Sequence, residues 1–285
     1  MAASPRIELV RRRVACEALA HPSGLSGPGI TFVSSPGDGG TYDPATGDGW
    51  NQELPGTNLE LVIELDGHWD LQIDGRSHRT TAFAAGLVVG PARSRALGPV
   101  RLVQLCLDPL AAPAVFGVPA GELSASAVDL DALLGRDGDE LRARLDDAFT
   151  DGDPVAVAER WVRERVRRPD TQPAEGAVVP ADVRLACALL RASGGTLRVE
   201  TLARELRCSR RHLARRFAEF VGVSPSAYAR LLRFERATGA LRDQPMQPLG
   251  SLAAETGYAD HAHMTRDFRV LAGATPTAVA ARFFA

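Results

Sequence analysis

The chain has 285 residues, which is enough for about two domains. Its apolar content of 45% and charged content of 24% are those of an ordinary globular protein, and its formal net charge is −2. No apolar run reaches the roughly 18 residues that a membrane helix needs. Residues 1–13 carry arginines with no apolar segment behind them, which argues against a signal peptide. We therefore expect a cytoplasmic protein without membrane contacts.

The first hundred residues predict short strands joined by loops. Residues 14–56 are rich in Gly, Pro, Ser and Asp, and one strand is expected there at residues 30–34. The signal sharpens at residues 59–65 and 68–73, because Asp66-Gly67 between them favours a tight hairpin. Further strands are expected at residues 77–83, 85–89 and 100–107. Regularly spaced strands with glycine turns predict a small antiparallel β-barrel or sandwich.

The pattern changes to helices after Pro109. Helical spacing predicts helices at residues 110–116, 129–134, 139–149 and 154–168. Three prolines in residues 169–180 indicate a linker. The fold class is therefore α+β, with a β-rich sensor or dimerisation domain at residues 1–168, the linker at 169–180 and an all-α domain at 181–285.

Catalytic and metal-binding patterns are weak. The four cysteines are too far apart in sequence for paired metal ligation. They are Cys16, Cys106, Cys187 and Cys208. A metal-binding barrel would need converging histidines, and the only candidates are His68 and His78, with Glu64. No catalytic triad can be recognised, so we expect no enzyme activity, no metal and no cofactor.

Residues 199–282 contain one pattern twice. Phenylalanine, glycine and proline recur 51 positions apart, as Phe217 and Phe268, Gly222 and Gly273, and Pro225 and Pro276. The start of the pattern recurs 50 positions apart, as Leu202 and Leu252, so the second copy has one extra residue in its turn. Such duplication indicates a repeated structural unit.

Each copy predicts a helix-turn-helix. Ser209 and Asp260 are suited to cap the second helix of each copy, and Gly257 supplies a left-handed residue at a helix end. The second helix would bury its residues at i and i+4: Leu213 and Phe217 in the first copy, and Met264 and Phe268 in the second. Residues 226–241 form the predicted linker helix, in which Gly239 should cost up to about 1 kcal/mol relative to Ala.

Basic charge is concentrated on this segment. Residues 181–285 hold 16 arginines and 9 acidic residues, a balance of +7, whereas the remainder carries −9. A basic segment in a slightly acidic chain is typical of a surface that binds phosphates. A helical bundle of two similar hairpins without a ligand would not explain this asymmetry.

The duplicated segment resembles the DNA-binding domain of the AraC/XylS family of transcription regulators. The resemblance covers about residues 181–285 and rests on the L-x-R-x-F second helix, the G-x-S-P start of the next helix and the duplication. A weaker resemblance to a subset of the family begins at Leu54-Pro55-Gly56 and includes Phe116-Gly117-Val118-Pro119. The paired histidines usual in sugar-sensing members are missing, so no sugar ligand is implied.

The resemblance implies a cytoplasmic protein that binds double-stranded DNA through the second helix of each copy. The candidate DNA-binding residues are Arg210, Arg211, Ala214, Arg215, Arg216, Arg230, His261, Ala262, Thr265 and Arg266. We expect base or backbone contacts from five of these, Arg211, Arg215, His261, Thr265 and Arg266, and phosphate contacts from Arg210, Arg216 and Arg230. Asp260 and Asp267 are expected to reduce the positive charge of the second copy.

Several points stay open at this stage. The β-rich domain is expected to bind a small-molecule effector, a partner or a second copy of itself, and RNA polymerase is a candidate partner of the whole. One alternative is a cupin-like metal- or small-molecule-binding protein with an appended helix-turn-helix domain. Another is a structural or anti-activator protein whose duplicated motif no longer binds DNA. Activation or repression and the operator are not given by the sequence.

Overall fold

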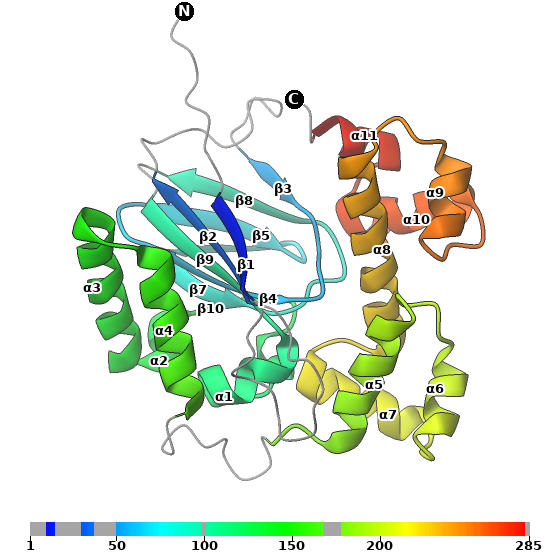
Figure 1. The fold of residues 1–285 in the computed structure, drawn as a ribbon, viewed down its shortest axis with the longest axis horizontal. Coiled ribbons are helices and arrows are strands. Elements are labelled where there is room, and N and C mark those ends of the chain that lie inside the picture. Colours follow the sequence, from blue (N-terminus) through cyan, green and yellow to red (C-terminus); the bar gives the residue numbers. More distant parts are fainter. Residues whose placement is uncertain (1–9, 15–29, 37–49, 98–100, 168–177, 283–285) are drawn as a thin grey trace, which may run out of the picture.

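The computed structural model describes residues 10–14, 30–36, 50–97, 101–167 and 178–282 (Figure 1). Two antiparallel sheets and the helices beside them form the N-terminal part. A separate set of helices forms the C-terminal part, on the other side of the molecule from α3 and α4 (Figure 1). Most of the predicted linker, residues 169–180, lies outside the described residues.

The two sheets are stacked and do not close into a barrel. The six-stranded sheet has the order β1 (Val10–Val14), β2 (Ile30–Pro36), β9 (Arg101–Leu107), β4 (Leu59–Glu64), β7 (Ala82–Ala85) and β10 (Ala127–Asp129). The four-stranded sheet has the order β3 (Asn51–Glu53), β8 (Ala92–Leu97), β5 (His68–Ile73) and β6 (Arg76–Thr80). The predicted antiparallel α+β class is confirmed, in its sandwich form.

Two strand predictions need correction. Residues 77–83 do not form one strand, because the chain passes at Thr81 from β6 in one sheet to β7 in the other. The strand expected at residues 85–89 ends at Ala85. At Gly86 the backbone N–H donates to the carbonyl of Leu123 at 2.9 Å, and a Cβ there would lie 2.1 Å from that oxygen. The close backbone contact replaces ladder pairing at this position.

Alternation along β4 divides the interior in two. Leu59, Leu61 and Ile63 are fully buried on the face that meets the helices. Val62 points the other way, into a smaller cluster with Trp69 and Leu71 of β5 between the sheets. This period of two is the signature of a strand with both faces covered by protein.

The helices of the N-terminal part cover the six-stranded sheet (Figure 1). They are η2 (Pro109–Ala111), α1 (Ala112–Phe116), η3 (Ala120–Leu123), α2 (Leu130–Leu134), α3 (Arg136–Asp151) and α4 (Pro154–Arg167). The predicted change to helices after Pro109 is confirmed. Their buried leucines and valines belong to the same core as the sheet, and that core continues into the C-terminal helices.

The C-terminal part contains the two predicted helix-turn-helix units. Its helices are α5 (Ala181–Ala192), α6 (Val199–Glu205), α7 (Arg210–Val221), α8 (Pro225–Asp243), α9 (Leu249–Glu255), α10 (His261–Ala272) and α11 (Pro276–Arg282). Helices α6 and α7 form the first unit, α9 and α10 the second, and α8 runs between them (Figure 1). No helix among the described residues is long and apolar enough to cross a membrane.

The predicted caps are present. The Ser209 hydroxyl accepts from the His212 N–H at 3.1 Å, and the Asp260 carboxylate accepts from the His263 N–H at 2.6 Å. Each satisfies one of the donors that a helix start leaves unpaired. Ser224 caps α8 in the same way, accepting from the Ala227 N–H at 3.2 Å, with Pro225 as first helical residue.

The two turns reach the same backbone conformation with different residues. Gly257 has a φ of 85°, as expected. Its counterpart 50 positions earlier is Arg207, with a φ of 51°, a left-handed conformation that is costly for a residue with a Cβ. The first unit therefore carries a local strain that the second avoids.

We predict that Arg207→Gly raises the free energy of unfolding by about 0.5–1 kcal/mol, since glycine adopts this conformation without strain. The matched change in the second unit, Gly257→Ala, should lower it by about 1–3 kcal/mol. Its Cβ would also lie 2.4 Å from Thr196 Cγ2. Urea unfolding of both variants measures the two values. Destabilisation by Arg207→Gly would contradict the assignment of strain.

Candidate functional site

An aromatic pair fixes the second helix of each unit to α8. Phe217 of α7 meets the ring of Tyr228 edge-on, with centroids 5.5 Å apart. Phe268 of α10 packs against Phe234 with centroids 4.7 Å apart. All four side chains have relative exposures near zero. Such pairs contribute about 0.5–1.5 kcal/mol beyond the burial of their area, so α8 holds α7 near its start and α10 at its middle.

The outer face of α7 is basic and accessible. Arg210, Arg211 and Arg215 are exposed, and Ala214 lies half-buried among them. Arg210 pairs with Glu200 of α6 at 2.9 Å, but both side chains are more than 60% exposed, so this pair contributes little and can be exchanged for another anion. The arrangement leaves a positive helix face available to a polyanion.

Arg216 differs from its neighbours on α7. It is half-buried, and its guanidinium lies 3.6 Å from the carboxylate of Asp182 on α5. His212 approaches the same carboxylate at 3.8 Å. The structure therefore places Arg216 beside α5, and its expected contact with a ligand would compete with this pair.

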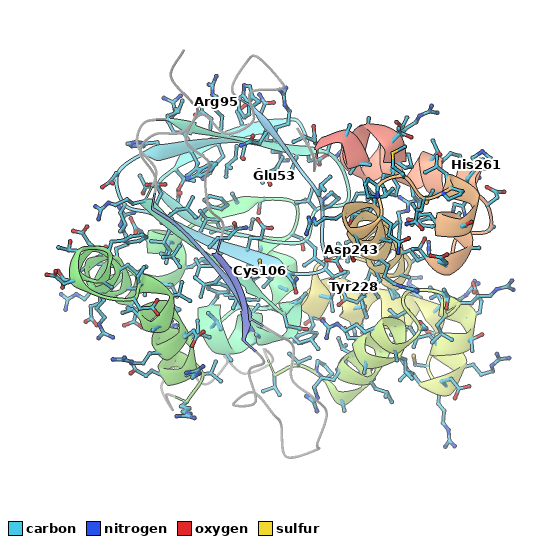
Figure 2. The ribbon with its side chains drawn as sticks, turned by 45° about the horizontal axis from the view of Figure 1, so that its top comes forward. Glu53, Arg95, Cys106, Tyr228, Asp243 and His261 are labelled. Carbon is cyan, nitrogen blue, oxygen red and sulfur yellow. The ribbon has the colours of Figure 1, made fainter. Side chains whose placement is uncertain are left out.

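The outer face of α10 carries less positive charge than that of α7. His261, Ala262 and Arg266 are exposed, and His261 lies at the edge of the molecule away from the sheets (Figure 2). Thr265 is half-buried, and its hydroxyl donates to the carbonyl of His261 at 2.8 Å. Because that bond uses the hydroxyl proton, Thr265 retains only acceptor capacity toward a ligand.

Asp267 does not face the surface, contrary to the expectation from sequence. Its side chain is buried, and its carboxylate lies 3.2 Å from Arg230 and 3.9 Å from Arg233, both on α8. The carboxylate thus ties α10 to α8 and does not reduce the positive charge of the outer face. The same pairing places Arg230 between α8 and α10, with about a third of its side chain exposed.

A surface groove lies beside the N-terminal ends of α7 and α8. It is lined by the turn at residues 195–200, by Arg210, Arg211 and Ala214, and by Ser224 and Ser226. The N-terminal end of α8 contributes a partial positive charge to it. Three of the predicted contact residues therefore meet at one concave surface, a connection that sequence spacing alone does not give.

The N-terminal part contains a second feature, a cavity of about 150 Å³ between the two sheets. Apolar side chains from both inner faces form most of its wall, including Val62, Leu71 and Phe83. Two carboxylates, Glu53 of β3 and Glu60 of β4, also line it, and Figure 2 shows Glu53 between the sheets. No local sequence pattern indicates this cavity, because its lining residues come from strands of both sheets.

Burial disturbs both cavity carboxylates. Burial and, to a smaller extent, the nearby charge of Glu53 together raise the pKa of Glu60 to about 7, against a hydrogen bond with Gln104 that lowers it. Burial also raises the pKa of Glu53, against a hydrogen bond that it accepts from the Ser94 hydroxyl. The solvent-accessible surface shows Glu53 as an exposed residue and Glu60 as a half-buried one, so burial affects Glu60 more reliably than Glu53.

The residues considered for a metal-binding barrel do not converge. His68 is exposed on the outer face of β5. His78 lies on β6, opposite Leu71 of β5, and its ring is 3.3 Å from the carboxylate of Asp129. Glu64 anchors a turn instead, since one of its oxygens accepts four backbone N–H groups at 2.9–3.3 Å. Within the described ranges, no three His, Cys, Asp or Glu side chains form a metal-binding group.

The structure describes Cys106, Cys187 and Cys208, and no disulfide bond joins any two of these three. Burial raises the pKa of Cys187 to about 12, and it also raises the pKa of Cys208 in the first turn. A raised pKa leaves little thiolate at neutral pH, so neither thiol is chemically activated.

Direct contacts join the cavity region to the C-terminal helices. The N–H of Thr57 donates to Glu235 Oε1 at 2.7 Å, and its hydroxyl donates to Glu235 Oε2 at 2.8 Å. Thr57 lies in the loop whose Leu54, Pro55, Gly56 and Asn58 line the cavity, and Glu235 lies on α8. Two hydrogen bonds to a charged carboxylate fix its position more firmly than one. This Thr57–Glu235 contact therefore connects the wall of the cavity to α8.

Two further contacts reinforce this junction. Asp108, at the end of β9, is buried and forms an ion pair with Arg191 of α5, which donates to the Tyr228 hydroxyl at 2.8 Å. The hydroxyl of Ser124 donates to the carbonyl of Gly222, after α7, at 2.7 Å. The sheets and the helix-turn-helix units are therefore joined by specific polar bonds.

Comparison with known proteins agrees with this architecture. A family model described as a helix-turn-helix domain matches residues 202–282. The crystal structure of ToxT from Vibrio cholerae O395 is similar at a TM-score of 0.50 and 11% identity, covering 82% of this chain and 94% of that one. No curated protein matches the sequence.

Two other similar structures cover about a third of this chain. One is a transcriptional regulator with an AraC-type DNA-binding domain from Chromobacterium violaceum, at 26% identity and a TM-score of 0.33, covering 36% of this chain and 91% of that one. The other is the C-terminal domain of AraT, a response regulator from Geobacillus stearothermophilus, at 22% identity and a TM-score of 0.35, covering 36% and 87%.

The duplicated helix-turn-helix, its basic outer face and the family match define a DNA-binding transcription regulator. Residues 202–282, which match the helix-turn-helix model, are similar to solved regulators of the AraC type. The resemblance inferred from the duplicated sequence is thereby confirmed, as is the two-sheet N-terminal fold beside it.

We predict that Glu60 makes stability depend on pH. The folded protein binds the Glu60 proton more tightly than the unfolded chain does, because the pKa is about 7 against an ordinary 4.5. Its contribution to the free energy of unfolding is therefore full below about pH 4.5 and is lost as the pH rises through 7. Between pH 5 and 8, the free energy of unfolding of the wild type should fall by about 1–3 kcal/mol relative to that of Glu60→Gln, which lacks the titrating group.

Urea unfolding at several pH values measures this difference, because subtracting the Glu60→Gln curve from the wild-type curve isolates one group. The exposed Glu140→Gln, on α3, is the control and should leave the wild-type curve unchanged in shape. Parallel curves for the wild type and Glu60→Gln would show that burial does not perturb this carboxylate.

Proposed function

We propose that the protein is a sequence-specific, cytoplasmic DNA-binding regulator whose affinity for its operator is controlled by a small molecule in the cavity between the sheets. One observation carries this proposal: the loop that lines the cavity is hydrogen-bonded through Thr57 to Glu235 on α8, the helix that holds both DNA-reading helices. A ligand that moves the loop thereby acts on the position of α8.

In this proposal α7 and α10 enter successive major-groove segments on one face of the duplex. Arg211 and Arg215 contact base edges, since an arginine can donate two parallel bonds to guanine. Arg266 makes the matching contact in the second unit, with His261, Ala262 and Thr265 beside it. Arg210 and Arg230, and Arg216 if it leaves Asp182, contact phosphates and position the protein without reading sequence.

The ligand is not carried over from similar proteins. A structure of ToxT from Vibrio cholerae strain SCE256 is described with an unsaturated fatty acid bound, and it resembles this chain at a TM-score of 0.48 and 12% identity. The cavity of this chain presents Glu53 and Glu60 to its occupant. A fatty-acid carboxylate would be repelled by both.

A metal-dependent cupin-like protein is the weaker alternative. The His68 and His78 side chains lie on opposite faces of their sheet, and Glu64 is occupied by backbone donors. A cupin-like protein could also bind a small molecule without a metal, and small-molecule binding between the sheets is already part of our proposal. Contacts with RNA polymerase and the formation of a homodimer remain further proposals that DNA-bound complexes would test.

We predict unequal contributions of the two units to DNA affinity. Arg211→Ala and Arg215→Ala should each weaken operator binding by about 1–3 kcal/mol, the range for a bidentate base contact. Arg266→Ala should cost less, because α7 carries more exposed arginines than α10. His261→Ala and Thr265→Ala should cost less again.

Fluorescence anisotropy with one operator at fixed salt measures these affinities. Arg160→Ala, exposed on α4 at the opposite side of the molecule, is the matched control for loss of one positive charge and should leave affinity unchanged (Figure 1). A loss for Arg266→Ala as large as that for Arg211→Ala or Arg215→Ala would refute the unequal division.

We also predict that the Thr57–Glu235 contact restrains DNA binding. Glu235→Gln removes the charge that holds two donors, which frees α8 to adjust to the grooves, so operator affinity should rise about 5-fold or more. Glu205→Gln, exposed on α6, makes the same change in charge without touching the cavity loop and should alter affinity less than 2-fold. Equal effects of the two variants would assign the change to charge alone.

A further inference from the structure

The cavity between the sheets has an unusual chemical lining. Its wall is mostly apolar, with Val62, Leu71 and Phe83 from three different strands. Glu53 and Glu60, one from each sheet, also line the cavity, with Glu60 half-buried and Glu53 exposed to solvent. Carboxylates in apolar surroundings are costly unless a donor or cation compensates them, so this pairing indicates what the cavity is built to hold.

Within the part of the chain that the structure describes, the side chains that hydrogen-bond to these carboxylates are neutral. Among the described residues, the bonds that oppose the rise in their pKa values come from the Ser94 hydroxyl for Glu53 and from the Gln104 amide for Glu60. The two charges also lie close enough together for Glu53 to raise the pKa of Glu60. A cation placed between them would relieve both the repulsion and the cost of burial.

Arg93 is the cationic side chain of the cavity wall, and its guanidinium lies over the ring of Trp50, 5.3 Å from the centroid. Such stacking is a favourable position for an arginine. This contact holds the Arg93 guanidinium against the indole ring of Trp50.

A second, independent observation points to an occupant. Trp69 lines the cavity and is only 8% exposed, yet its Nε1–H has no hydrogen-bond partner among the described residues. An indole N–H is a donor that is nearly always paired when buried. An acceptor atom of a bound molecule would satisfy it, and the indole face would stabilise a neighbouring cation.

We propose that the cavity binds a compact organic amine, with its ammonium group between Glu53 and Glu60, its apolar body against Val62, Leu71 and Phe83, and an acceptor atom toward Trp69. The volume of about 150 Å³ limits the ligand to one ring or a short branched chain, since cavities of this size accept benzene-sized molecules. Regulation of DNA binding by this amine rests on the proposed function; the binding itself does not.

Calorimetric titration of the full chain with benzylamine, benzyl alcohol and benzoate tests the class of ligand, because the three differ mainly in charge. Benzylamine should bind at least 10-fold more tightly than benzyl alcohol, and benzoate should not bind. Glu60→Gln should weaken benzylamine at least 10-fold and leave benzyl alcohol unchanged. The exposed Glu140→Gln is the control and should change neither.

Ala85→Leu locates the site. Ala85 lines the cavity, so the larger side chain should abolish binding of both benzylamine and benzyl alcohol. Unfolding curves without ligand show whether each variant is folded. Benzoate or oleate binding as tightly as benzylamine, benzylamine binding unaffected by Glu60→Gln, or no benzylamine binding to the folded wild type would each overturn the amine site.

Operator affinity measured in the same samples separates this inference from the proposed function. An amine that binds without changing operator affinity would leave the amine site standing and contradict control through the cavity. A change in operator affinity caused by benzoate or oleate, with no effect of benzylamine, would support control through the cavity and contradict the amine.

Discussion

The packing of α8 against α7 and α10, the second helices of the two helix-turn-helix units, is the constraint on which the rest of the structure depends. Tyr228 holds Phe217 of α7 near one end, and Phe234 holds Phe268 of α10 further along. Both contacts are made by one uninterrupted helix of 19 residues, and successive major-groove segments on one face of DNA lie roughly 34 Å apart. One rigid helix can therefore present both recognition helices to one side of a duplex, and Asp267 strengthens the second junction through Arg230.

The same helix receives the contacts from the sheets, which is why the two parts of the chain can influence each other. Arg191 connects the buried Asp108 to the Tyr228 hydroxyl, beside the aromatic pair that holds α7. Thr57 connects the cavity loop to Glu235, one residue after Phe234. A ligand changes DNA affinity only as far as it favours one arrangement of these contacts over another. The polar bonds at α8 provide a physical route for that difference.

The sequence was sufficient for the C-terminal fold but not for the N-terminal site. The duplication, the caps at Ser209 and Asp260 and the turn at Gly257 are local signals, and the structure confirms them. The cavity brings together Glu53 and Glu60 from strands of different sheets, and no local pattern encodes that meeting. Strand β8 was missed because its alternation of small and charged residues carries no apolar signal, and Asp267 appeared as surface charge because its partners lie about 35 positions away.

Selection of genomic DNA fragments by the full chain tests the central claim most directly, namely that one chain reads two groove segments through helices fixed on α8. The account predicts an enriched motif with two specified blocks whose centres lie about 10 base pairs apart, one helical turn. Arg211→Ala should relax sequence preference in one block and Arg266→Ala in the other. No enrichment, a single block, or two blocks half a turn apart on opposite faces of the duplex would contradict the account.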